Sequence, residues 1–152
     1  MRVVENFFPM LFGIFIGYYC YKNEYEFISY NQSKELIKQF TTIGTCTFGF
    51  LLTLFGLIIQ SNSDVIREIR KRKIPYRRFI LYNRKVVFIS LLLTIYSYII
   101  GYLDWDKLLP NCKIFPSFIT SIFWGGFSWF IIETIYFLII FYILIQDKYD
   151  TI

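Results

Sequence analysis

Histidine and alanine are both missing from this 152-residue chain. Without histidine, the chain lacks the side chain that serves most often as a general base near neutral pH and as a metal ligand. The phosphate-binding loops G-x-x-x-x-G-K-[ST] and G-x-G-x-x-G are absent from the sequence as well. The polar segments are too short to build a substrate pocket. We therefore expect a protein that is not an enzyme and that uses no cofactor.

Cysteine is scarce, with three residues in the chain, Cys20, Cys46 and Cys112. Their spacing matches no metal-binding pattern, and two of them fall inside apolar runs. We therefore expect no metal site and no disulfide framework.

Of all residues in the chain, 56% are hydrophobic, and long stretches of the sequence carry no charge. These stretches reach about 18 residues or more, enough for a helix to cross a hydrocarbon layer of about 30 Å. No small-residue cleavage site follows the first stretch, so we expect a retained helix rather than a secretory signal. We predict an all-α integral membrane protein, a single domain over residues 1–152 with four transmembrane helices at about 4–21, 40–59, 86–103 and 117–145.

Lysine and arginine gather between the second and third predicted spans. Residues 60–85 hold nine of them: Arg67, Arg70, Lys71, Arg72, Lys73, Arg77, Arg78, Arg84 and Lys85. The segment between spans one and two holds three, and the segment between spans three and four holds two. The positive-inside rule then places the basic segment in the cytoplasm, and four spans bring both termini to the same side.

Pro75 divides this basic segment into a predicted helical hairpin. Proline discourages helix at the residue before it, so we expect a turn at residues 73–75 and a new helix running through Tyr82 into span three. Two interpretations of the charge remain open. The first is topological, with long side chains reaching anionic headgroups. The second is a binding surface for an acidic trigger, either a partner protein or an anionic nucleotide or nucleic acid, with candidate residues Arg67, Arg70, Lys71, Arg72, Lys73, Arg77 and Arg78.

Small residues recur at helical spacing in all four spans, and lipid-embedded helices associate through such positions. In spans one and two the stripes predict helix packing, through Gly13, Gly17, Thr45, Gly49, Thr53 and Gly56. The hydroxyl stripe of span three, Ser90, Thr94 and Ser97, suggests either packing within one protomer or the lining of an oligomer axis. In span four, Gly125 and Gly126 form either a hinge or a point of close approach for a neighbouring backbone. A homo-oligomer is compatible with this pattern.

Glu133 is the one carboxylate inside the apolar run "SWFIIETIYFLII". It lies 12 residues before Ile145, or about 18 Å at 1.5 Å per residue, which is close to mid-bilayer. We expect no lysine or arginine in the other spans to neutralise it, so its partners should be hydroxyl groups. An ionisable group at this depth suggests a functional site, and the alternative is a protonated acid that joins two helices.

The second span, "TTIGTCTFGFLLTLFGLI", and the basic segment "REIRKRKIPYRRFILYNRK" carry a resemblance. Over residues 41–101 the chain resembles the small multi-pass membrane effectors of bacterial anti-phage, abortive-infection systems. This resemblance implies a non-enzymatic protein of the inner membrane that awaits a partner or nucleotide signal and then perturbs the membrane.

We therefore expect an oligomeric effector that permeabilises or depolarises the inner membrane when triggered. Its pore or gate candidates are Glu133, Ser90, Thr94, Ser97, Gly125 and Gly126. The main alternative is a non-conducting membrane anchor, assembly subunit or immunity protein that binds another protein. A proton-coupled transporter is a third possibility, weakened by the lack of an inverted repeat.

Overall fold

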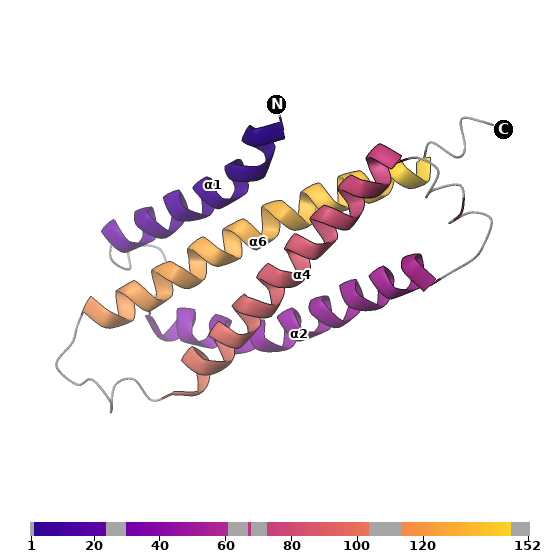
Figure 1. Cartoon of the computed structure of the whole chain (residues 1–152). Coiled ribbons are helices and arrows are strands. Elements are labelled where there is room, and N and C mark those ends of the chain that lie inside the picture. The colour runs from indigo at the N-terminus through magenta and orange to yellow at the C-terminus, as the bar shows by residue number, and fades with distance from the viewer. Residues whose placement is uncertain (1, 24–29, 61–66, 68–72, 104–113, 147–152) are drawn as a thin grey trace.

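Four long helices make up the structure, a computed structural model that describes residues 2–23, 30–60, 67, 73–103 and 114–146 (Figure 1). They are α1 (Arg2–Lys22), α2 (Tyr30–Gln60), α4 (Lys73–Tyr102) and α6 (Ile114–Gln146). Pro75 and Pro116 each stand in the first turn of a helix, where the missing amide hydrogen costs no hydrogen bond. The predicted all-α architecture is confirmed for these residues.

Three of these helices are long and apolar enough to cross a membrane, over Gln32–Gln60, Tyr76–Tyr102 and Pro116–Ile143. The fourth helix, α1, falls short by the same measure. Membrane-spanning helices are therefore supported for α2, α4 and α6, and a fourth span over α1 stays a prediction.

The helices follow one another in space in the order α1, α6, α4, α2 (Figure 1). Helix α1 lies along α6, α4 lies between α6 and α2, and α2 touches α6 only slightly. Successive contacts along α4 and α6 run in opposite directions, because Phe79 meets Phe137 while Tyr96 meets Ile119. The two helices are therefore antiparallel.

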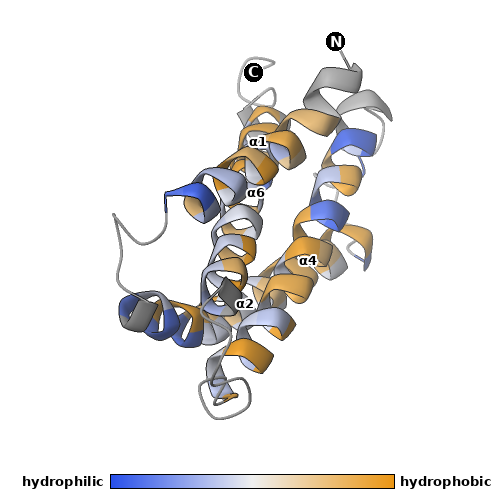
Figure 2. Cartoon of the chain, turned by 90° about the vertical axis from the view of Figure 1, so that its left-hand side faces the viewer, coloured by the Kyte–Doolittle hydropathy of each residue, from blue (hydrophilic) through white to orange (hydrophobic). Residues whose placement is uncertain are grey.

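Aromatic side chains fill the space between α2, α4 and α6. The ring of Phe40 stands edge-on to three rings of α6, at centroid distances of 5.7 Å, 5.6 Å and 5.8 Å for Phe123, Phe127 and Phe130. Away from this core, the helices expose large apolar side chains, and hydrophobic stretches recur along the ribbon (Figure 2). Such a surface suits a lipid environment better than water.

Helix α4 begins earlier than the predicted third span. It runs without interruption from Lys73 to Tyr102, so the helix expected after Pro75 does continue into the span. Lys73 and Pro75 belong to its first turn rather than to a separate turn. Residues 61–66 and 68–72, where the rest of the predicted hairpin falls, lie outside the described residues. The consequence for the site is that Arg84 and Lys85 are helical residues of α4.

Candidate functional site: a buried charge pair between two helices

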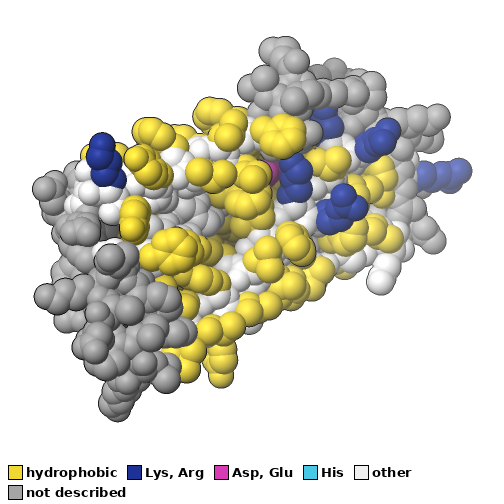
Figure 3. Space-filling view, turned by 60° about the vertical axis from the view of Figure 1, so that its left-hand side comes forward, with side chains coloured by type: hydrophobic (Ala, Val, Ile, Leu, Met, Phe, Trp, Pro, Cys, Tyr) yellow, Lys and Arg dark blue, Asp and Glu magenta, His cyan; other side chains and the backbone are white. Residues whose placement is uncertain are grey.

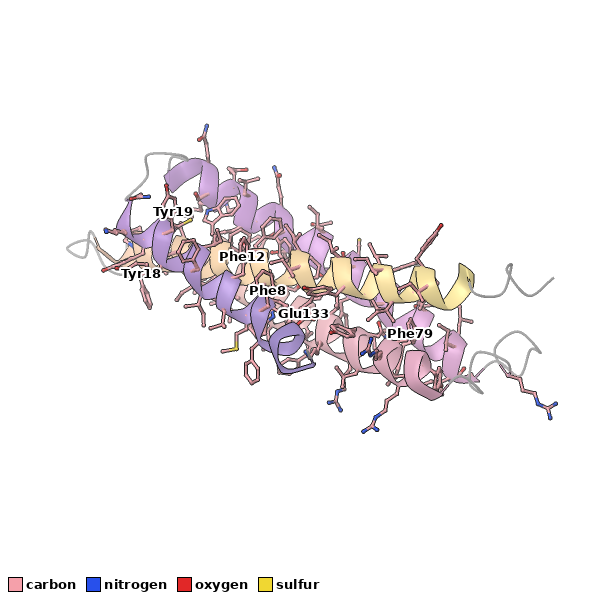
Figure 4. The ribbon with its side chains drawn as sticks, turned by 90° about the horizontal axis from the view of Figure 1, so that it is seen from above. Phe8, Phe12, Tyr18, Tyr19, Phe79 and Glu133 are labelled. Carbon is pink, nitrogen blue, oxygen red and sulfur yellow. The ribbon has the colours of Figure 1, made fainter. Side chains whose placement is uncertain are left out.

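Glu133 occupies the middle of α6 and is 1% exposed. Figure 4 shows it near the centre of the molecule's long axis, with Phe79 of α4 farther toward one end. The helix turns that precede and follow it also point into the interior, because Phe130 and Phe137 are buried. Helical spacing of three and four residues therefore holds the carboxylate against α4.

Lys85 of α4 is the partner of this carboxylate. Its Nζ lies 3.7 Å from Glu133 Oε1, and its side chain is 28% exposed against 2% for that of Glu133. The expectation that Glu133 has only hydroxyl partners is therefore wrong. In the sequence, Lys85 ends the basic segment just before the third span, which is predicted to begin at Val86, so it was not counted among the residues facing Glu133. In the structure the same helix runs from Lys73 through Lys85 to Tyr102.

Aromatic groups surround the pair. The indole Nε1 of Trp129, one turn before Glu133 on α6, donates to Glu133 Oε1 at 3.4 Å. The ammonium of Lys85 lies 5.3 Å from the centroid of the Tyr82 ring, a favourable cation–π distance. The ring of Tyr136 lies 6.0 Å from that of Tyr82. The indole N–H thus partly compensates the carboxylate, and the Tyr82 ring partly compensates the ammonium, at a buried position.

The second carboxylate oxygen, Glu133 Oε2, is buried and has no hydrogen-bond partner among the described residues. A buried acceptor left unsatisfied costs about 1–3 kcal/mol. The contact at 3.7 Å is also longer than a good charge-assisted hydrogen bond, which is about 2.7–2.9 Å. The pair is therefore incompletely compensated within the described residues.

The pair lies close to one end of the apolar face of α4. From Phe88 to Tyr102 this helix exposes apolar side chains, while the exposed residues Arg77 and Arg84 precede Phe88 along the helix. Figure 3 shows most of the basic side chains on this face toward one end, beside a broad hydrophobic area and a small acidic one. Measured along α4, Glu133 thus lies close to the end of the exposed apolar face, although it stands in the middle of α6.

The hydroxyl stripe of α4 faces a different neighbour. Ser90 is fully buried and donates to the carbonyl oxygen of Gly44 in α2 at 3.2 Å. Thr94 contacts Gly44 and donates to the carbonyl oxygen of Ser90, and Ser97 is fully buried with its Oγ unpaired among the described residues. The structure therefore does not bring this stripe together with Glu133, because the stripe faces α2 and Glu133 lies between α4 and α6.

Gly125 and Gly126 admit neighbouring helices. A Cβ at Gly125 would lie 2.8 Å from the carbonyl oxygen of Gly13 and 3.3 Å from the Cα of Gly17, both in α1. A Cβ at Gly126 would lie 2.9 Å from a methyl group of Leu93. Helix α6 is continuous through both glycines. Of the two predicted roles, hinge or close approach of a neighbouring helix, these contacts match close approach for Gly125 and Gly126.

Helix α2 turns its predicted packing stripe outward. Thr45, Gly49 and Thr53 are exposed, and a Cβ at Gly49 or Gly56 would meet nothing within 4 Å. The face of α2 that does pack carries Ile37, Phe40 and Leu51, together with Gly44, for which the stripe pattern gave no signal. Among the described residues of one chain, helix contact through Thr45, Gly49, Thr53 and Gly56 is therefore not formed.

The trigger-binding candidates are only partly described. Arg67, Arg77 and Arg78 are exposed. Lys73 is the first residue of α4, while Arg70, Lys71 and Arg72 lie outside the described residues.

Comparisons with known proteins add no assignment to this geometry. No family model matches the chain, and neither a curated protein nor a solved structure does so.

Proposed function

We propose that this protein is a non-enzymatic effector of the bacterial inner membrane that assembles from several copies and permeabilises the membrane when triggered. The contact between Lys85 and Glu133 carries the proposal. An ion pair among apolar side chains is often no more stable than a well-packed apolar pair of similar volume. Ionisable groups inside membrane helices are correspondingly rare and mark functional sites.

In the silent state, the Lys85–Glu133 contact holds α4 against α6. The trigger opens this contact, in which the two ions are 3.7 Å apart and Oε2 has no hydrogen-bond partner among the described residues. When the helices separate, the carboxylate and the ammonium need water, because neither ion is stable alone in hydrocarbon. A hydrated strip between two membrane helices then gives ions a path.

Assembly uses the outward face of α2 in this proposal. Gly49 and Gly56 leave open space beside the helix, and two copies can approach closely along such positions. Helix α1 crosses the membrane with the other three helices and is held by its glycine contact with α6. Both termini then lie in the cytoplasm, together with the basic segment that receives an acidic partner protein or an anionic nucleotide signal.

A second candidate function is a non-conducting anchor, assembly subunit or immunity protein. The same open face of α2 favours it, because a different membrane protein can dock there. In that case Glu133 has only a structural contact with Lys85, and opening the pair changes no membrane potential.

Inducible expression in bacteria with a voltage-sensitive dye tests the proposal without knowledge of the trigger. Glu133→Leu and Lys85→Met each remove one ion, and we expect either variant to depolarise the cells, while wild type does not. The double variant carries an apolar pair and should be silent. Gly13→Val disturbs the α1–α6 contact instead and serves as a control for general destabilisation. Normal potential in both single variants, at wild-type abundance in the membrane, would contradict a permeabilising role.

A further inference from the structure

Arg77, Arg78 and Arg84 form an exposed basic group on the first three turns of α4. Arg77 and Arg84 are seven residues apart, so they lie on the same helix face about 10.5 Å apart along the axis. Leu81 and Phe88 occupy this same face and are exposed as well. Within the part of the chain that the structure describes, none of the three guanidinium groups forms an ion pair.

The depth of these arginines follows from the neighbouring helix. Phe79 of α4 meets Phe137 and Phe141 of α6, and Tyr82 meets Tyr136. At this level α6 exposes Leu138, Ile139 and Tyr142. These side chains belong in hydrocarbon or at its edge, so the bilayer extends along α6 to the level of Arg77 and Arg84. The arginine side chains must then reach a polar group at the membrane surface.

The helix itself adds to this requirement. Backbone N–H groups at a helix N-terminus carry partial positive charge, which disfavours cations in the first turns. Glu133 is the acidic side chain described nearest to this level, and it is buried against Lys85. Among the described residues, no acidic side chain at this level compensates Arg77, Arg78 and Arg84, so these guanidinium groups are open to an anion from outside the chain.

We propose that Arg77, Arg78 and Arg84 bind the phosphate of an anionic phospholipid in the leaflet at this end of α4. The guanidinium groups bind the phosphate oxygens through paired hydrogen bonds, as arginine does for planar or tetrahedral oxyanions. One acyl chain lies along Leu81 and Phe88 and continues over the apolar face of α4. The lipid phosphate thus neutralises the charge at the end of this helix face, and its acyl chain covers the exposed hydrophobic side chains beyond.

Native mass spectrometry of the purified full chain tests this site. The probe is phosphatidylglycerol in competition with phosphatidylcholine of identical acyl chains, in detergent micelles. We expect wild type to retain phosphatidylglycerol preferentially. Each of Arg77→Gln and Arg84→Gln should weaken that preference about fivefold, since one cation near an anionic membrane surface contributes about 1 kcal/mol. Arg84→Lys keeps the charge and should retain most of the preference.

Arg67→Gln is the matched control, because Arg67 is exposed and lies outside α4. Equal retention of the two lipids by wild type would overturn the proposal, and so would an equal loss in Arg67→Gln. Displacement of the lipid by millimolar inorganic phosphate, or by a short oligonucleotide, would also overturn it in favour of a soluble anion. Because this measurement involves no membrane potential, it stands or fails independently of the permeabilising function.

Discussion

Glu133 and Lys85 come from helices whose other side chains at this level are mostly apolar, so each ion is the principal compensation for the other. Trp129 and the Tyr82 ring reduce the charge density of the pair, but neither replaces an opposite charge. Removing one ion leaves its partner without this opposite charge, whereas removing both leaves no buried charge to compensate. The two residues should therefore be strongly coupled.

A double-mutant cycle measures this coupling. We expect Glu133→Leu and Lys85→Met each to lower the free energy of unfolding by about 1–3 kcal/mol, less than for a fully buried pair because Lys85 is partly exposed. The double variant should lose clearly less free energy of unfolding than the two single variants lose together. Steric trapping in detergent micelles gives the three values. Effects that add within about 0.5 kcal/mol would show that the two ions are not coupled.

At this scale the sequence identified one half of the pair. Glu133 was recognisable because it interrupts an apolar run, and Lys85 was not, because it stands beside Arg84 at the end of a basic segment. Hydropathy places a span boundary where charges begin, but a helix continues past that boundary whenever its charges find partners. Little in the sequence indicated that Trp129 donates to Glu133, because tryptophan in a membrane helix is usually assigned to the membrane interface.

At the scale of the helices, α1 is held to α6 through glycine contacts. Gly13 and Gly125 bring the two backbones so close that a Cβ at either position would lie under 3.0 Å from the other's carbonyl oxygen. Helix α1 makes its main contact with α6 alone. This one interface therefore decides whether α1 stays in the bundle.

Gly125→Val should weaken the α1–α6 interface by about 1–3 kcal/mol through overpacking. Gly49→Val is a matched change in a helix glycine that has open space around it, so it should leave the fold intact. Thermal unfolding of both variants in the same detergent compares them. A similar loss in the two would mean that the close α1–α6 contact contributes nothing to stability.

Cys46 gives a native probe of assembly, because it is exposed on α2 and lies one turn from Gly49. In a Cys20→Ser/Cys112→Ser background, mild oxidation in native membranes should cross-link Cys46 between copies of the chain. Adding Gly49→Val should reduce the cross-linked fraction severalfold, since the added methyl groups keep the helices apart. A purely monomeric band in the parent background would exclude assembly through this face of α2.

The sequence predicted where helices would form better than it predicted which way they face. Apolar runs located α2, α4 and α6, because a membrane helix needs a long uncharged segment. Small-residue stripes occur on several faces of α2, however, and periodicity alone does not decide between Gly44, which packs on α4, and Gly49, which is open. That choice depends on how the aromatic side chains of α6 pack around Phe40.

On the scale of the whole molecule, the number of membrane crossings depends on α1. If α1 crosses with α2, α4 and α6, both termini lie on the same side as the basic end of α4. Reporter fusions at the N-terminus and the C-terminus of the full chain should then both report the cytoplasm. Opposite locations of the two reporters would mean three crossings, with α1 lying along α6 without spanning the bilayer.

The most direct test of the account is ion flux through membranes that contain only this protein. Purified full-length chain is reconstituted into vesicles containing phosphatidylglycerol, and a potassium diffusion potential is followed with a voltage-sensitive dye. We expect vesicles with Glu133→Leu to lose the potential rapidly, while vesicles with wild type or with the Lys85→Met/Glu133→Leu double variant retain it. A potential that persists in Glu133→Leu vesicles at equal protein density would contradict the claim that opening the Lys85–Glu133 contact makes the membrane permeable.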